Sequence, residues 1–138
     1  MTRTAAALRR QAGGRNPLPG LLFFTDPART PDIEATAKRL PRGSAIVYRS
    51  FGAAGAQDRA LGLRAIGLRR GLVLLIGADE ALAARVHAHG VHLPQRLAHR
   101  ARALKARGYL VTAAAHSLAA ARRALAYGAD AEIGRAHV

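Results

Sequence analysis

Residues 90–95 read Gly-Val-His-Leu-Pro-Gln (GVHLPQ), a short and mainly apolar run that ends at a proline and a polar side chain. A run of this length and composition is typical of a strand buried in a sheet. His92 and Gln95 stand at or beside the C-terminal end of that strand. In parallel α/β folds the loops that follow the strands gather at this end and bind ligands. His92 and Gln95 are therefore candidate substrate-binding residues.

Similar apolar runs recur along the chain, with helix-sized segments between them. They begin at residues 21, 45, 72, 91 and 110. Intervals of this size are those of repeated βα units, in which a helix connects each strand to the next parallel strand. The pattern therefore predicts an α/β fold. It does not choose between a barrel and a doubly wound sheet, because both have this periodicity.

The helices between these strands have recognisable features. A helix is expected at 57–70, with Leu61, Ala65 and Leu68 along one apolar stripe, which would face the core. Asp79 and Ser117 directly precede predicted helices, and both residue types are good N-caps because their side-chain oxygens accept hydrogen bonds from the first turn.

The composition limits the class of protein. The chain has 138 residues, no cysteine and a formal net charge of +14 at pH 7. The lack of cysteine excludes disulfides, thiolate metal sites and a cysteine nucleophile. The arginines are scattered over the predicted helices without aromatic residues to stack on bases, so they indicate a solvated surface rather than nucleic-acid binding. No run has membrane-spanning length, which predicts a soluble, cytoplasmic protein; the oligomeric state stays open.

Three further polar residues follow predicted strands. Asp26 comes after the first strand and is a candidate for substrate binding, although an aspartate here also suits a turn. Arg49 follows the second strand, where a guanidinium could hold a phosphate with two hydrogen bonds. His116 follows the fifth strand and could act as acid and base, since imidazole titrates near neutral pH. The three histidines at 87, 89 and 92 span a helix end and a strand start, which argues against convergence on a metal.

The order of short motifs resembles that of a known family. LLFFTD, VYR, LLIGAD, GVHLPQ, AAHS and YGAD follow one another over residues 21–130. In this order and at these intervals they resemble the thiamine phosphate synthase and TenI family. The resemblance implies a (β/α)8 TIM barrel, of which about five βα units are present and the C-terminal units are missing. Of the two folds that periodicity allows, it favours the barrel.

The resemblance also implies two related reactions. The synthase couples a thiazole phosphate to hydroxymethylpyrimidine diphosphate and uses Mg²⁺, whereas TenI moves a proton on the thiazole phosphate without a metal. Several positions that the synthase uses differ here: Gly77 and Ala78 stand in place of an asparagine and an aspartate, and Leu97 and Ala114 in place of an acidic residue and a serine. This pattern is closer to TenI, whose acid/base histidine corresponds to His116.

The ends of the chain are expected to differ from the rest. Residues 1–20 predict a flexible basic leader, in which a short helix over residues 4–11 is an option, and 21–131 an incomplete TIM-barrel domain. Residues 132–138 (EIGRAHV) do not resemble a sixth strand. The codons GAG ATC GGA AGA GCA CAC GTC would encode them and match the start of a common sequencing adapter, so we expect a non-native tail after an unpaired fifth strand.

The leading interpretation is an enzyme of thiamine biosynthesis that acts on thiazole phosphate, by coupling or by tautomerisation. Arg49, His92, Gln95 and Asp26 would bind the substrate and His116 would transfer protons. The 138-residue chain itself is expected to lack activity, because units that carry phosphate-binding loops are missing. The alternatives are a non-catalytic relative that binds a phosphorylated ligand and, in third place, a basic nucleic-acid-binding protein.

Overall fold

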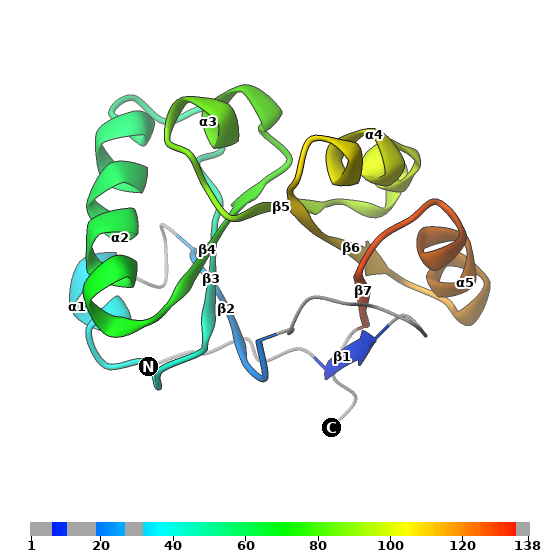
Figure 1. The fold of residues 1–138 in the computed structure, drawn as a ribbon, viewed down its shortest axis with the longest axis horizontal. Coiled ribbons are helices and arrows are strands. Elements are labelled where there is room, and N and C mark those ends of the chain that lie inside the picture. Colours follow the sequence, from blue (N-terminus) through cyan, green and yellow to red (C-terminus); the bar gives the residue numbers. More distant parts are fainter. Residues whose placement is uncertain (1–6, 11–18, 27–31, 135–138) are drawn as a thin grey trace.

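A computed structural model describes the protein at residues 7–10, 19–26 and 32–134. Its centre is one curled sheet in which each strand from β2 to β7 is parallel to its neighbour (Figure 1). The strand order is β1-β7-β6-β5-β4-β3-β2, so β2 to β7 follow the sequence from one edge inward. The strands are β1 (Ala7–Arg10), β2 (Leu22–Phe24), β3 (Ala45–Tyr48), β4 (Val73–Gly77), β5 (Gly90–Leu93), β6 (Leu110–Ala115) and β7 (Ala131–Gly134).

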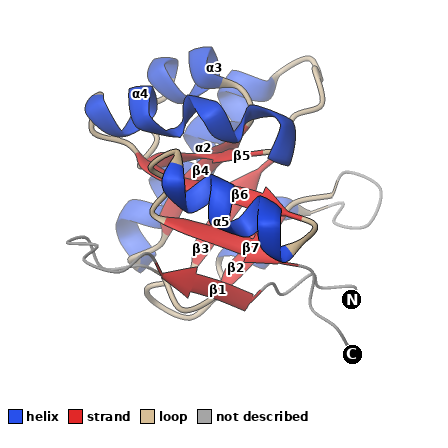
Figure 2. Ribbon diagram, turned by 90° about the vertical axis from the view of Figure 1, so that its right-hand side faces the viewer, coloured by secondary structure: helices blue, strands red, loops and turns tan. Residues whose placement is uncertain are grey.

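Helices connect the parallel strands and lie on the outer face of the curled sheet (Figures 1 and 2). This arrangement confirms the predicted α/β fold as a partial TIM barrel, with five βα units followed by β7. The helical segments are α1 (Ile33–Ala37), α2 (Ala56–Arg70), α3 (Glu80–Arg85), the 3₁₀ helix η1 (Gln95–Arg100), α4 (Ala101–Ala106) and α5 (Leu118–Ala126).

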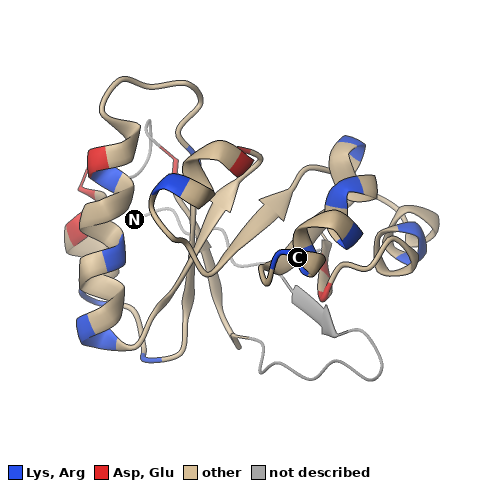
Figure 3. Cartoon of the chain, turned by 45° about the horizontal axis from the view of Figure 1, so that its top comes forward, with Lys and Arg blue, Asp and Glu red and all other residues tan. Residues whose placement is uncertain are grey.

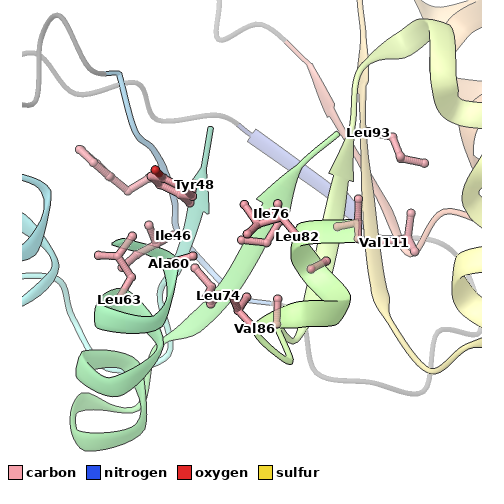
Figure 4. Close-up of a cluster of buried hydrophobic side chains, with 14 of the residues drawn as sticks. Ile46, Tyr48, Ala60, Leu63, Leu74, Ile76, Leu82, Val86, Leu93 and Val111 are labelled. Carbon is pink, nitrogen blue, oxygen red and sulfur yellow. The ribbon is translucent and has the colours of Figure 1, made fainter. Parts of the chain in front are cut away.

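The main hydrophobic core lies between the sheet and these helices. Alternate strand residues point toward the helices, because successive side chains of a strand face opposite ways. Ile46, Leu74 and Val111 belong to this layer and contact buried residues of the helices, such as Leu63 and Leu82 (Figure 4). A smaller cluster is formed by strand residues whose side chains lie on the opposite face of the sheet. It contains Leu22, Ala45, Val47, Leu75 and Ile133.

The predicted N-caps are confirmed. The Asp79 carboxylate accepts a hydrogen bond of 2.9 Å from the backbone N–H of Leu82 at the start of α3. Ser117 Oγ accepts one of 3.0 Å from the N–H of Ala120 in α5. Each cap satisfies a backbone donor that has no partner inside the helix, which fixes where the helix begins relative to the strand before it.

The predicted buried stripe of α2 was wrong. Leu68 is 64% exposed and Leu61 is 40% exposed, whereas Leu63 and Ile66 are buried. The helix carries leucine and alanine on several sides, so its apolar pattern does not define one face. Contact with α1 and β4 selects the buried side.

Residues 132–134 also differ from expectation. They belong to β7, which is parallel to β6 with Ala113 in register with Glu132, so the fifth strand of the predicted series is paired on both sides. Ala131, Glu132 and Ile133 are all buried. Residues 135–138 lie outside the described residues, and the non-native origin of 132–138 stays a prediction.

The first twenty residues contain one described element besides residues 19 and 20. Ala7–Arg10 form β1, which is antiparallel to β7. The optional helix over residues 4–11 is therefore wrong for these four residues, which are not a loose segment either. The rest of the predicted leader, residues 1–6 and 11–18, lies outside the described residues.

Basic side chains are distributed over the outer helices. Figure 3 marks the lysine and arginine positions, which are spread over several helices, including α2 and α5. Among the described segments, none of the helices combines the length and the apolar composition that crossing a bilayer requires.

Candidate functional site

The larger of two cavities described here lies where the parallel strands end. Its volume is about 790 Å³, and residues at the C-terminal ends of β2 to β6 contribute to its wall. A cavity of this size is in the range of small-molecule sites. The lining residues are Phe24, Arg49, Ser50, Phe51, Gly52, Gly77, Ala78, Asp79, Glu80, His92, Pro94, Arg96 and Ala114.

Arg49 is held in this wall by Thr25, which is fully buried at the end of β2. The Arg49 backbone N–H donates to Thr25 Oγ1 and its Nε donates to the Thr25 carbonyl oxygen, both at 2.9 Å. The guanidinium carbon lies 5.5 Å from the ring centroid of Phe24 and 5.4 Å from that of Phe51. Both distances allow a cation–π interaction. The guanidinium is thus oriented through Nε, while no hydrogen bond or ion pair from a described residue engages its two Nη atoms.

His92 forms a buried part of the same wall. Its side chain stacks edge-on against Phe24 with ring centroids 5.0 Å apart, and its Nδ1 lies 2.8 Å from Thr112 Oγ1 on the neighbouring strand. His92 and Thr112 are in register across β5 and β6, which places the two side chains on the same face. Burial, and then the positive charge of Arg49, lower the pKa of His92 to about 4. His92 is therefore a neutral imidazole at pH 7.

The acidic side chains of the cavity are already engaged. Glu80 accepts two hydrogen bonds of 2.9 Å from Arg100, and this interaction lowers the pKa of the Glu80 carboxyl. One oxygen of Asp79 caps α3. Across the described residues, no three His, Cys, Asp or Glu side chains gather where they could hold a metal.

This set of donors does not fit a Mg²⁺ site of the kind that the resemblance implies. Mg²⁺ prefers oxygen ligands in octahedral geometry. Gly77, Ala78 and Ala114 line the cavity but have no side-chain oxygen. Glu80 faces a guanidinium that neutralises it. Asp79 is left as the carboxylate nearest to such a role.

A second cavity, of about 360 Å³, contains two more of the predicted site residues. Gln95 and His116 both line it, and Gln95 Oε1 accepts a hydrogen bond of 2.8 Å from the backbone N–H of His116. Arg96 lines both cavities. The structure thus brings Arg49 and His92 together in one cavity, and Gln95 and His116 in its neighbour.

Asp26 lines neither of the two cavities. Sequence reasoning also passed over Thr25, Phe51 and Arg96. Thr25 was visible as a polar residue at a strand end, where ligand-binding groups gather. Phe51 had no such signal in the sequence. It is an exposed loop residue, and only its distance to the Arg49 guanidinium connects it to the cavity.

Comparisons with known proteins agree with this architecture. The sequence profile of a family described as thiamine monophosphate synthase matches residues 21–134. Among solved structures, the chain is similar to a thiamine phosphate pyrophosphorylase from Pyrococcus furiosus, with a TM-score of 0.67 and 24% sequence identity. The match covers 79% of this chain and 55% of that chain, so the protein spans about half the length of this relative. No curated protein sequence matches.

Proposed function

The chain belongs to the thiamine monophosphate synthase family, and from that premise we propose that it serves thiamine biosynthesis by binding a thiazole phosphate in the larger cavity. The observation that carries this proposal is the fixed guanidinium of Arg49 in a cavity of suitable size. Thr25 orients the guanidinium before any ligand arrives, which reduces the entropy lost on binding. The Nη atoms can then donate to two phosphate oxygens.

The rest of the cavity supports an anion with an aromatic body. Phe24 and Phe51 offer ring faces beside Arg49. His92 contributes a neutral imidazole beside the Phe24 ring, and Arg96 supplies a second cation in the wall. A phosphate would therefore meet arginine, while a planar heterocycle would contact aromatic and small apolar side chains.

Of the two family reactions, the side chains favour proton transfer on the thiazole phosphate over coupling to a pyrimidine diphosphate. Coupling expels pyrophosphate, whose charge Mg²⁺ would neutralise when bound, and the donor set here does not fit that ion. In the proton transfer, the imidazole of His116 accepts a proton from one ring-system atom and returns it to another, so no net charge or group is lost. A substrate anchored at Arg49 would have to extend past Arg96 to approach His116.

Binding is the first test, because it does not require the complete reaction. Thiazole phosphate is titrated into the 138-residue chain by calorimetry, with Arg49→Met and the control Arg69→Met, which removes an exposed arginine at the end of α2. Loss of charged hydrogen bonds to Arg49 should weaken binding about ten-fold or more. Equal affinity of the two variants would contradict the proposal.

Activity assays then distinguish proton transfer, coupling and the second candidate function, which is ligand binding without catalysis. Deuterium incorporation from D₂O into the thiazole phosphate without Mg²⁺, lost in His116→Gln, would identify proton transfer. Mg²⁺-dependent formation of thiamine phosphate would identify coupling. Binding without either reaction would agree with the predicted inactivity of the 138-residue chain and with a non-catalytic ligand-binding relative, which the small side chains at Gly77, Ala78 and Ala114 favour.

A further inference from the structure

We propose that the second cavity, between η1 and α5, is a separate binding site for phosphate or the phosphate group of a small metabolite. The cavity shares Arg96 and His116 with the proposed thiazole reaction, but phosphate binding here does not require a thiazole in the larger cavity. The cavity is lined by Gln95, Arg96, Ala98, His99, His116, Ala120, Arg123 and Tyr127, and none of these residues is acidic.

The two walls come from elements with regular spacing. Ala120, Arg123 and Tyr127 lie three and four residues apart at α5 and its C-terminal cap, so they share one face of the helix. Ala98 of η1 and Ala120 of α5 are both buried, and η1 contacts α5. Their small side chains allow the two elements to approach while the longer basic side chains form the wall.

Several basic residues near this cavity are engaged by other groups of the protein. Arg100 is paired with Glu80, and Lys105 forms an ion pair of 2.7 Å with Asp130. Arg102 donates to the carbonyl oxygen of Ala126.

In contrast, the two arginines of the cavity have no such partner in the part of the chain that is described. Neither the Arg96 nor the Arg123 guanidinium makes a hydrogen bond or an ion pair there. Both guanidinium groups line the same cavity, so both are available to an anion that binds there.

Further hydrogen-bond donors of the cavity complete the recognition of a phosphate. Gln95 is oriented by the hydrogen bond that its Oε1 accepts from His116 N–H, which leaves its amide N–H₂ as a donor. His99, His116 and the Tyr127 hydroxyl can also donate. Arginine forks and further N–H and O–H donors, without a carboxylate, form a set that suits a phosphate and disfavours a cation.

The test is a phosphate titration followed by NMR, with the C2–H resonances of His99 and His116 as local probes. Inorganic phosphate and glycerol 3-phosphate are compared at constant ionic strength with chloride. The dissociation constant for phosphate, obtained from these shifts, should rise about ten-fold or more in Arg123→Gln. The adjacent exposed Arg122 does not line the cavity, so Arg122→Gln should leave the dissociation constant unchanged. Tighter binding of glycerol 3-phosphate would assign the site to phosphorylated metabolites, and equal binding would assign it to free phosphate.

The variant Arg49→Gln distinguishes phosphate binding in the second cavity from binding in the larger cavity, because Arg49 lines only the larger one. The phosphate-induced histidine shifts should survive Arg49→Gln. The inference is overturned if Arg122→Gln and Arg123→Gln behave alike, if the histidine shifts do not saturate, or if they disappear in Arg49→Gln.

Discussion

The buried His92 should make the protein less stable as the pH falls. Its pKa is about 4 in the folded chain, compared with an ordinary value of 6.5. Between these values the unfolded chain binds more protons at this site than the folded one, so the free energy of unfolding rises with pH. The contribution of neutral His92 to the free energy of unfolding is complete above about pH 6.5 and is lost as the pH falls toward 4.

The size of the effect follows from the pKa difference. Each pKa unit corresponds to about 1.36 kcal/mol, so the loss between pH 7 and pH 4 is roughly 3 kcal/mol. The cause is local: protonation would put a charge on a side chain that is 8% exposed and close to the Arg49 guanidinium. The hydrogen-bond partner of His92 Nδ1 is the uncharged hydroxyl of Thr112. This partner does not offset the positive charge that protonation would add.

The assay compares the wild type with His92→Asn, because an asparagine amide can replace Nδ1 as the partner of Thr112 and does not titrate. Urea unfolding is measured from pH 7 to pH 4, and His92 is followed in parallel by NMR. The wild type should lose roughly 3 kcal/mol more than the variant over this range. Other titrating groups, including His89, are present in both proteins and cancel. A His92 pKa near 6.5, or parallel stability curves, would refute the reasoning.

Three further predictions concern packing and charge, each measured by urea unfolding at pH 7. Gly90→Ala should destabilise by about 3 kcal/mol or more, since its Cβ would lie within 2.8 Å of Leu75 and clash with the β6 backbone, whereas Gly20→Ala meets nothing within 4 Å and should change little. Leu63→Ala should cost about 2–5 kcal/mol, and the exposed Leu68→Ala about 0.5 or less. Glu80→Gln should cost about 1 kcal/mol or less, because its ion pair is partly exposed.

The strands could be predicted from sequence because each is a buried run with a clear boundary. The starts expected at residues 21, 45, 72, 91 and 110 lie within one residue of the starts of β2 to β6. The final strand was missed because a carboxylate in a strand interior is a signal against burial. In the structure Glu132 is only 2% exposed, and pairing of β7 with β6 and β1 accounts for the strand. Such pairing depends on residues distant in sequence, which local patterns do not contain.

The strand-end positions of four candidate residues were predictable, but their grouping was not, and their roles stay predictions. The sequence predicted that Arg49, His92, Gln95 and His116 lie at the C-terminal ends of the parallel strands. All four positions agree with the structure. Two hydrogen bonds then divide them. Thr25 orients Arg49 in the larger cavity, and the side chain of Gln95 binds the His116 backbone beside the smaller one. Neither contact has a signature in the spacing of residues along the chain.

This division has a chemical consequence for the proposed function. If one substrate uses both Arg49 and His116, it must extend past Arg96, and an Arg49 variant would weaken binding while a His116 variant would slow proton transfer with affinity retained. If the two cavities bind different anions, a change at Arg123 would weaken phosphate binding and leave the affinity for the thiazole phosphate unchanged. Because Arg96 borders both cavities, its replacement should affect both ligands, and this shared wall is where the two sites could influence each other.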